Sequence, residues 1–193
     1  MTTFVLATAN THKVTEMTAV LAELGIEVLP RPEDLAEVDE TQDTLVGNAL
    51  LKARAVMGAS GHASVADDTG LFVDALNGEP GVFSARYSGE GATDEKNVAK
   101  LLTALEMSGS ENRSAAFRTV IAVVYPDGRE IVVEGVLPGR IAEIPVGDNG
   151  FGYDPIFIPD LGESRTLAQM SLAEKNEHSH RARALRALAA TLR

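Results

Sequence analysis

The sequence predicts a protein of the α/β class, and three observations support this. Short apolar runs of strand length alternate with segments in which apolar residues recur every three or four positions. The strongest strand pattern, residues 115–125, is followed by a Pro-Asp-Gly turn and by a second strand pattern at residues 130–137, which predicts a long β-hairpin. With 193 residues, 45% of them hydrophobic, the chain can bury a substantial core. We therefore expect one domain over residues 1–193, with room for a smaller lobe.

Composition narrows the possible functions. The net charge of −11 argues against a nucleic-acid-binding surface, for which a basic patch is expected. The chain contains no cysteine, so disulfides, thiolate metal sites and a cysteine nucleophile are excluded, and any metal must be held by oxygen or by the four histidines. No membrane span and no secretory signal is apparent. We expect a cytoplasmic protein that does not associate with membranes.

The first predicted strand leads through a polar loop into a helix. Residues 3–7 are apolar, and the apolar positions of the following helix are Val14, Met17, Leu21 and Leu24, with Gly25 at its C-terminal end. The loop holds Thr8, Asn10 and Thr11, all good N-cap types, and Lys13 lies in the first turn. A helix N-terminus beside a lysine favours an anion, a phosphate above all. The alternative is that these residues only cap the helix.

A second helix is predicted from the N-cap Thr44, after a short strand at residues 26–29 and an acidic connection. Its apolar side contains Leu45, Ala49, Ala53 and Val56. Asn48 and Lys52 are four residues apart and share a helix face, so both could reach a ligand near the helix start. A solvated surface lysine is the alternative.

Two adjacent carboxylates, Asp67 and Asp68, stand between the apolar runs 63–66 and 71–73, followed by Thr69 and Gly70. Neighbouring side chains of an extended segment point to opposite faces, so one carboxylate can face a pocket while the other holds the loop. A carboxylate at a strand end beside a hydroxyl suits a hard divalent cation or an activated water. An Asp-rich turn between two strands is the alternative.

Two aromatic residues and a carboxylate lie together after the hairpin. A helix is predicted over residues 94–106 and a further strand over residues 140–144, which leads into a loop ending at residues 151–155, Phe-Gly-Tyr-Asp-Pro. This group suggests a platform on which a ring can stack, with a polar group beside it. A turn anchored by buried aromatics is the alternative.

The C-terminal segment, residues 171–193, is predicted as a helix that opens with a capping box formed by Ser171 and Glu174. Lys175, His180 and Arg181 lie in its first part and could recognise an anion or a carbonyl group. His178 and His180 point to different sides of a helix, which argues against a shared metal ion. A solvated helix end is the alternative.

Six sequence blocks together carry a family resemblance over essentially the whole chain. They are ATANTHK (7–13), NALLKA (48–53), ADDTGL (66–71), PGVFSARYSG (80–89), GFGYDPIF (150–157) and EKNEHSHR (174–181). The chain resembles the inosine/xanthosine triphosphate pyrophosphatases, which hydrolyse non-standard purine nucleoside triphosphates to the monophosphate and pyrophosphate. The resemblance implies an elongated α/β fold with a mixed, twisted sheet, flanking helices and two lobes around a nucleotide cleft. It also implies a homodimer.

The resemblance further implies roles for individual residues. Asp68 is the expected catalytic residue and ligand of Mg²⁺, with Thr69 in contact with substrate. The expected triphosphate loop contains Thr8, Ala9, Asn10, Thr11, His12 and Lys13, with Lys52 as a second cation. The base is expected on the platform Phe151, Gly152, Tyr153 and Asp154, with recognition completed by Lys175, His180 and Arg181.

One position departs from the family pattern. A glutamate that helps to hold the metal is expected just before the Asn-Ala pair, where this chain has Gly47. Asp67, Asp43 or Glu40 could substitute, or water and substrate phosphates could complete the metal shell. Two other hypotheses remain open at this point. A Maf-type nucleotide pyrophosphatase is less consistent with the first loop, and a nucleotide-binding sensor without catalysis would explain Gly47.

Overall fold

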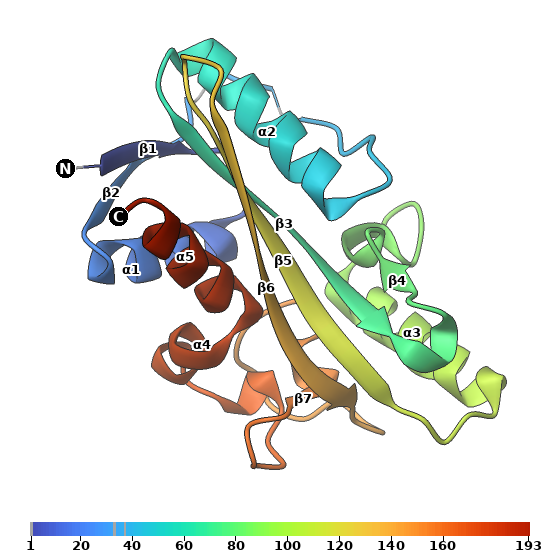
Figure 1. Ribbon diagram of the computed structural model, residues 1–193. Helices are drawn as coiled ribbons and strands as arrows, with labels where there is room; N and C mark the ends of the chain where they lie inside the picture. The colour runs from blue at the N-terminus through green and yellow to red at the C-terminus, as the bar shows by residue number, and fades with distance from the viewer. Residues whose placement is uncertain (1, 33, 37) are drawn as a thin grey trace. The chain divides into compact units, whose positions relative to one another are not determined.

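The computed structural model describes residues 2–32, 34–36 and 38–193 and confirms the α/β class (Figure 1). The helices are α1 (Thr11–Glu23), α2 (Leu45–Ser60), α3 (Asp94–Ser108), α4 (Leu172–His178) and α5 (His180–Thr191). The strands are β1 (Thr2–Leu6), β2 (Ile26–Leu29), β3 (Ser64–Val73), β4 (Pro80–Gly81), β5 (Ser114–Val124), β6 (Glu130–Ile141) and β7 (Phe157–Pro159). Within the described ranges, no helix is long and apolar enough to cross a membrane.

The strands form a mixed sheet, as expected. In the part of the chain that is described, the strand order is β2-β1-β3-β5-β6-β7, and β4 pairs with β3. Strand β1 is parallel to both β2 and β3, whereas β3 with β4 and β6 with β7 are antiparallel. The parallel β1 to β3 pairing brings the end of β1 beside the start of β3, with Val5 opposite Ser64 and Leu6 opposite Val65. The loop after β1 and the carboxylates of β3 therefore come from neighbouring strands.

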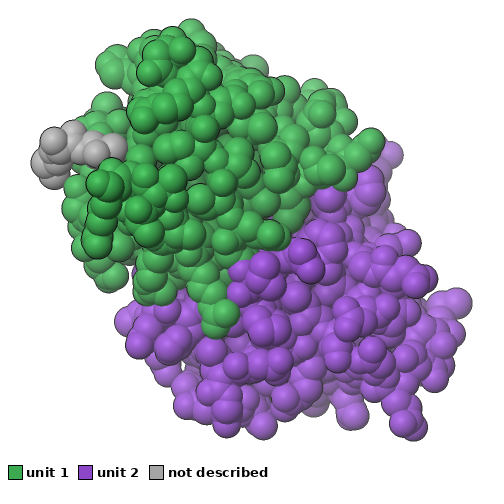
Figure 2. Space-filling view, viewed as in Figure 1, with its two compact units in different colours: residues 1–68, 119–135, 180–193 green, residues 69–118, 136–179 purple. Residues whose placement is uncertain are grey.

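The chain divides into two compact units (Figure 2). Unit 1 contains residues 1–68, 119–135 and 180–193, and unit 2 contains residues 69–118 and 136–179. The boundaries fall inside β3, β5 and β6, so each of these strands contributes to both units. Asp68 is the last residue of its segment in unit 1, and Thr69 is the first residue of unit 2.

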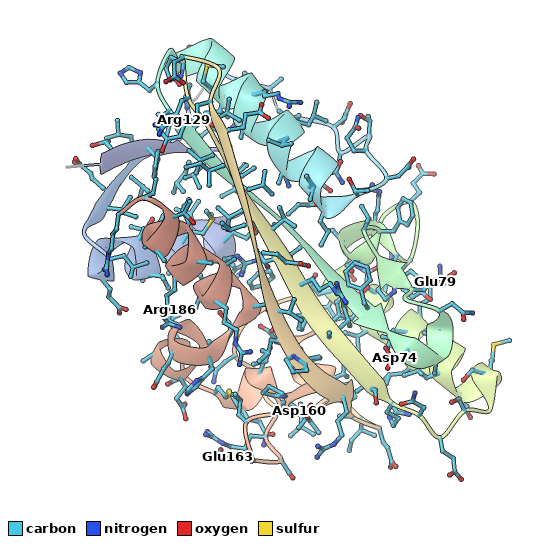
Figure 3. The ribbon with its side chains drawn as sticks, viewed as in Figure 1. Asp74, Glu79, Arg129, Asp160, Glu163 and Arg186 are labelled. Carbon is cyan, nitrogen blue, oxygen red and sulfur yellow. The ribbon has the colours of Figure 1, made fainter. Side chains whose placement is uncertain are left out.

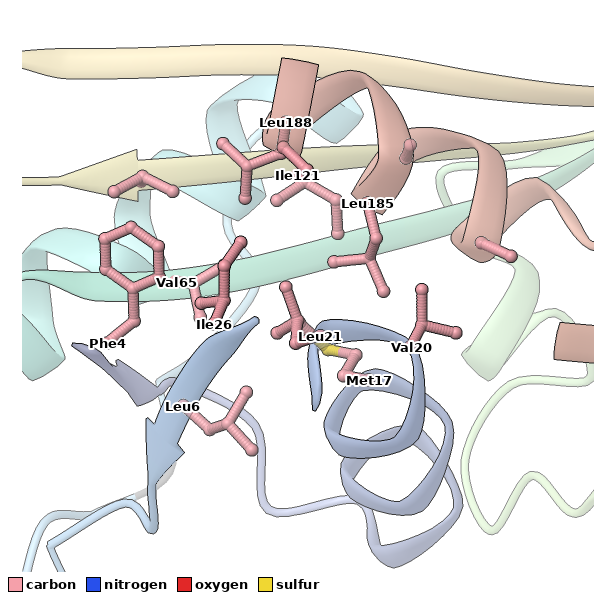
Figure 4. Packing of buried hydrophobic residues seen from close by; sticks show 14 residues of the cluster. Phe4, Leu6, Met17, Val20, Leu21, Ile26, Val65, Ile121, Leu185 and Leu188 are labelled. Atoms are coloured by element: carbon pink, nitrogen blue, oxygen red, sulfur yellow. The ribbon is translucent and has the colours of Figure 1, made fainter. Parts of the chain in front are cut away.

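The core of unit 1 is formed by the apolar faces predicted for the first and last helices (Figure 4). Met17 and Leu21 of α1 pack with Leu185 and Leu188 of α5, and all four are fully buried. Strand residues from β1, β2, β3 and β5 complete this cluster, among them Phe4. Packing against the strands thus stabilises the region where β1 enters α1.

The core of unit 2 is formed around helix α3. Leu101 and Leu105 of α3 lie in one buried cluster with Phe117 of β5 and Phe157 of β7. The two phenylalanine rings meet edge to face, with centroids 4.7 Å apart, a favoured arrangement for aromatic pairs. The predicted helix over residues 94–106 is therefore a core element of this unit.

The hairpin of β5 and β6 is confirmed, and its turn is closed by hydrogen bonds. The amide of Tyr125 donates to the carbonyl of Arg129, and that of Gly128 donates to the carbonyl of Tyr125. Gly128 has a φ of +86°, a conformation that favours glycine. At this end of the hairpin the guanidinium of Arg129, labelled in Figure 3, lies 3.9 Å from the centroid of the Tyr125 ring.

Three sequence predictions need correction. The two apolar runs around Asp67 and Asp68 belong to one continuous strand, β3, so the carboxylates lie within a strand and not at its end. The predicted strands 130–137 and 140–144 are largely one strand, β6, which ends at Ile141. The predicted C-terminal helix is two helices, because Ser179 takes an extended conformation with ψ of 158°. This break makes His180 and Arg181 the first residues of a new helix.

Candidate functional site

The loop between β1 and α1 is ordered by its own side chains. Asn10 is the N-cap of α1, and its side-chain oxygen accepts from the amides of His12 at 3.0 Å and Lys13 at 3.2 Å. The hydroxyl of Thr8 accepts from the amide of Asn10 at 3.2 Å. Because Asn10 already satisfies two amides of the first turn, an anion here would depend strongly on the positive helix end and on Lys13. Ala9, Thr11 and His12 lie in the same loop and helix start and are exposed.

A buried network of charges joins this loop to the start of α5. Asp67 Oδ2 lies 3.1 Å from Lys13 Nζ and accepts a hydrogen bond from Arg181 Nε at 3.1 Å. Arg181 also pairs through Nη1 with Glu16 of α1. Burial alone would raise the pKa of Asp67, but Lys13 and Arg181 hold it well below its usual range. Asp67 is therefore an ionised carboxylate whose function is to hold two cations.

The second carboxylate, Asp68, has a separate set of partners. Lys52 Nζ donates to Asp68 Oδ1 at 3.0 Å and to Glu40 Oε1 at 2.7 Å. Asn48 Nδ2 donates to Asp68 Oδ2 at 3.3 Å, and its side-chain oxygen accepts from the amide of Gln42 at 3.0 Å. Asn48 and Lys52 therefore lie on one face of α2, as their spacing predicted.

Burial raises the pKa of Asp68 to about 6, with a further contribution from the Glu40 carboxylate included in that value and with Lys52 opposing it. Neighbouring carboxylates with opposite pKa shifts are typical of sites in which two acids serve different purposes. Asp67 stays charged, whereas Asp68 titrates close to neutral pH and can exchange a proton. The interpretation that the two side chains serve different partners is confirmed.

The environment of Gly47 explains how this chain accommodates its departure from the family pattern. A Cβ atom at Gly47 would lie 2.8 Å from Cβ of Gln42 and 3.0 Å from Oγ1 of Thr44. The space for a larger side chain is thus filled by Gln42. Glu40, in contrast, shares the ammonium group of Lys52 with Asp68 and is the second carboxylate of this part of the site. Outside residues 1, 33 and 37, no group of three or more His, Asp or Glu side chains could hold a metal ion.

His180 is fixed at the start of α5 by two contacts within unit 1. Its Nδ1 lies 2.5 Å from the hydroxyl of the buried Thr119 of β5. Its carbonyl oxygen lies so close to β6 that a Cβ atom at Gly135 would approach it to 2.1 Å. Gly135 thus permits the close approach of helix and strand, and Thr119 then sets the orientation of the imidazole.

In unit 2, residues 151–154 form a turn, called the aromatic turn below, and hydrogen bonds hold it in place. Asp154 Oδ2 accepts from the amide of Phe151 at 2.9 Å and from Lys175 Nζ at 2.7 Å. Lys175 Nζ also lies 5.2 Å from the centroid of the Phe151 ring. Tyr153 is buried and donates its hydroxyl proton to the carbonyl of Ser84 at 2.9 Å, and burial raises its pKa. Tyr153 is therefore an anchor, and the half-buried Phe151 is the aromatic face that remains for stacking.

The structure brings the predicted site residues together in two groups. Unit 1 holds residues 8–13, Asp68, His180 and Arg181, and unit 2 holds Thr69, residues 151–154 and Lys175. Lys175, predicted to act together with His180 and Arg181, is paired within unit 2 with Asp154.

Several contacts of the candidate site were not predicted from the sequence. Glu16 gave a usable signal, since it is an acid beside the apolar stripe of α1 and one turn from Lys13. Thr119 is one polar residue within an apolar strand, which is a weak signal. Asp94, whose Oδ2 accepts from the amide of Gly152 at 2.7 Å, gave none, because an acid in the first turn of a helix is common.

The fold defines an α/β protein, and the carboxylates and cations of the unit 1 group suit a ligand that carries phosphate and a divalent cation. The chain belongs to the Ham1 family, whose sequence profile matches residues 4–191. It is 50% identical to the dITP/XTP pyrophosphatase of Nitratidesulfovibrio vulgaris, over 96% of this chain and 93% of that protein. It is 46% identical to the dITP/XTP pyrophosphatase of Streptomyces coelicolor, over 100% of this chain and 98% of that protein.

Solved structures give the same result. The structure of a HAM1 protein from Coxiella burnetii matches with a TM-score of 0.90 at 42% identity, over 100% of this chain and 98% of that one. The Ham1 protein of Staphylococcus aureus matches with a TM-score of 0.85 at 39% identity, over 98% and 97% of the two chains. The predicted family resemblance is confirmed.

Proposed function

We propose that this protein hydrolyses non-standard purine nucleoside triphosphates (dITP, ITP and XTP) to the nucleoside monophosphate and pyrophosphate, which removes them from the nucleotide pool. The observation that carries the proposal is the Asp68 group, in which a buried carboxylate of raised pKa lies beside Lys52 and Glu40. Its relatives named dITP/XTP pyrophosphatase, 46% to 50% identical over nearly their whole length, support this substrate class.

Mg²⁺ is the cofactor we propose. The donor set fits it, because Asp68 and Glu40 supply carboxylate oxygens and Mg²⁺ commonly uses one or two carboxylates, with water and substrate phosphates in the other positions. When bound, the ion would neutralise charge on the phosphate oxygens and favour ionisation of water. Lys52 keeps the two carboxylates together, and Asn48 donates to the second oxygen of Asp68, which fixes the direction in which its lone pairs point.

The remaining predicted site residues of unit 1 stabilise negative charge on the triphosphate. Water attacks the α-phosphorus and pyrophosphate leaves, so negative charge must be stabilised on the oxygens of the triphosphate. Lys13 and the N-terminus of α1 are held in advance by Asp67 and Asn10, as electrostatic stabilisation requires. Asp68, a buried carboxylate held by Lys52 and Asn48, is the group we assign to accept the proton of the attacking water.

Base selectivity follows from the donors predicted to face the purine. Lys175, His180 and Arg181 offer hydrogen-bond donors that suit the 6-oxo group of hypoxanthine or xanthine. Adenine would set a 6-amino donor against them, which leaves buried groups unpaired at a cost of about 1 to 3 kcal/mol each. The Phe151 ring would stack on the base, and Thr69 would contact the substrate.

The test is pyrophosphate release from ITP, dITP, XTP, GTP, ATP, CTP and UTP, with and without Mg²⁺. We expect hydrolysis largely confined to the inosine and xanthosine substrates, abolished by EDTA and reduced at least a thousandfold in Asp68→Asn. Asp127→Asn is the matched control and should retain activity, because Asp127 is an exposed acid in the turn between β5 and β6. ITP binding without hydrolysis by folded wild type would instead establish the sensor, and preference for other nucleotides would favour the Maf-type reaction.

We further propose that both units act as one domain, that the protein is a cytoplasmic enzyme and that it forms a homodimer. Light scattering during size-exclusion chromatography tests the dimer, for which twice the chain mass of 20.4 kDa is expected.

A further inference from the structure

A hydrogen bond between α3 and the aromatic turn has no part in the function proposed so far. Asp94, the first residue of α3, accepts a hydrogen bond at 2.7 Å from the amide of Gly152. An ionised carboxylate that accepts a backbone N–H makes one of the stronger hydrogen bonds found in proteins. The contact lies within unit 2 and joins two segments that are 58 residues apart.

Helix α3 does not need Asp94 as its cap. Thr93 is the N-cap, and its hydroxyl accepts from the amide of Lys96 at 3.3 Å. Asp94 does complement the positive end of the helix, but Glu95 is a second acid in the same turn and can do this as well. The contact that distinguishes Asp94 from Glu95 is the hydrogen bond to Gly152.

Within the aromatic turn, Gly152 can be held in place by other residues only through its backbone. It has no side chain and takes a φ of +63°, which glycine adopts without strain. On one side Asp154 accepts from the amide of Phe151, and on the other the hydroxyl of Tyr153 is fixed to Ser84. The bond from Gly152 to Asp94 fixes the peptide that joins Phe151 to Gly152, and therefore the backbone position from which the Phe151 ring projects.

We propose that Asp94 is a positioning residue for the purine base, which acts through Gly152 to hold the Phe151 face in place. This rests on the proposed function, in which that face stacks on the base. Asp94 does not touch the reacting atoms. Because the base is bound equally in the ground state and in the transition state, loss of its platform should raise KM and leave kcat nearly unchanged.

The variants are Asp94→Ala, Asp94→Asn and the matched control Glu95→Ala. We expect Asp94→Ala to raise KM for ITP about tenfold and to weaken binding of IMP, measured by calorimetry, by the same factor. Inhibition by pyrophosphate, which carries no base, should not change. Asp94→Asn should recover part of the loss, since its amide oxygen can still accept from Gly152, and Glu95→Ala should behave as wild type.

Three results would overturn the proposal: unchanged KM and IMP affinity in Asp94→Ala, an equal loss in Glu95→Ala, or an equal weakening of pyrophosphate and IMP. The last would identify a general effect on the fold. Failure of the proposed function is recognised separately, because wild type would then release no pyrophosphate. The IMP affinities of wild type and variants would still test Asp94, and a wild type that binds no IMP would overturn the proposal for Asp94.

Discussion

The two units hold their cations by different means. In unit 1 the carboxylate of Asp67 lies between Lys13 and Arg181, and Arg181 has a second buried partner in Glu16. In unit 2 the carboxylate of Asp154 holds Lys175 and also accepts from a backbone amide. When one side chain of such a network is removed, several ion pairs are lost together. When one side chain is removed from a turn that is also held by backbone hydrogen bonds, only its own contact is lost. This difference can be tested by removing one cation from each unit.

The largest effect is expected for Arg181→Met. This change leaves Asp67 and Glu16 buried without their guanidinium partner, and breaking a buried ion pair in this way costs about 3–5 kcal/mol. Lys175→Met should cost less, because it strands one carboxylate that keeps the amide of Phe151. Urea unfolding of both variants and wild type measures the two losses. An equal or reversed order would show that the distinction between the units is wrong.

Gly135→Ala should be the next most destabilising. The added Cβ would lie 2.1 Å from the carbonyl oxygen of His180 and 2.4 Å from the amide nitrogen of Ala184, both backbone atoms. Overpacking of this kind costs about 1–3 kcal/mol, and here it would also displace His180 and lower kcat/KM. Gly58→Ala is the control, because its Cβ meets nothing within 4 Å and the helix α2 should gain about 0.5–1 kcal/mol. Thermal unfolding measures the change in stability of both variants. Destabilisation by both changes would contradict the steric explanation.

The adjacent carboxylates should respond to pH with opposite signs. The folded-state pKa of Asp67 is lowered, so its stabilising contribution is complete above its ordinary pKa of about 3.9 and is lost as the pH falls below it. The pKa of Asp68 is raised to about 6, so its ionisation lowers stability as the pH rises from about 4 to 6.

Each effect amounts to at most about 1.4 kcal/mol per pH unit. The free energy of unfolding, measured in EDTA from pH 2 to 7, should therefore show a shallower acid limb in Asp67→Asn and a smaller fall between pH 4 and 6 in Asp68→Asn. The same change of slope in both variants would contradict the opposite pKa shifts.

The smallest effect is expected for Thr119→Val. The change keeps the shape of the buried side chain but removes the hydroxyl beside Nδ1 of His180, at a cost of about 1 kcal/mol. Thr119→Ser should restore most of the lost kcat/KM for ITP, because it keeps the hydroxyl. Steady-state kinetics on both variants measures this. If Val behaves as wild type and Ser is impaired, the methyl group and not the hydroxyl supports the imidazole.

Local patterns were sufficient to predict most of the secondary structure. The caps at Thr44 and Ser171 and the turn at Gly128 depend only on neighbouring residues and were predicted correctly, and Asn10 is one of the three N-cap candidates named for the first helix. The break at Ser179 was missed because nothing in its neighbours interrupts the helical pattern. The unbroken strand β3 was missed because Asp, Thr and Gly in sequence favour a turn, and here burial and pairing with β4 override that preference.

The candidate site was less predictable than the fold. Residue types and the family resemblance indicated which positions to examine, but not which pairs form. Asp67 meets Arg181 only because β3 and the start of α5 lie together in unit 1, and Asp94 meets Gly152 only within unit 2. Such contacts depend on packing between segments far apart in the chain, which no local pattern encodes.

The position of Asp67 and Asp68 within one extended strand limits how this gene can change in length. Insertion or deletion of one codon in the connection ahead of Glu40 would leave the alternation of side chains along β3 unchanged. One codon added or lost inside β3 before Asp67 would turn every later side chain to the opposite face. The residue that holds Lys13 and Arg181 would then exchange places with the residue that holds Lys52. Descendants of this gene should therefore vary in the length of the connection ahead of Glu40 while the spacing within β3 stays constant.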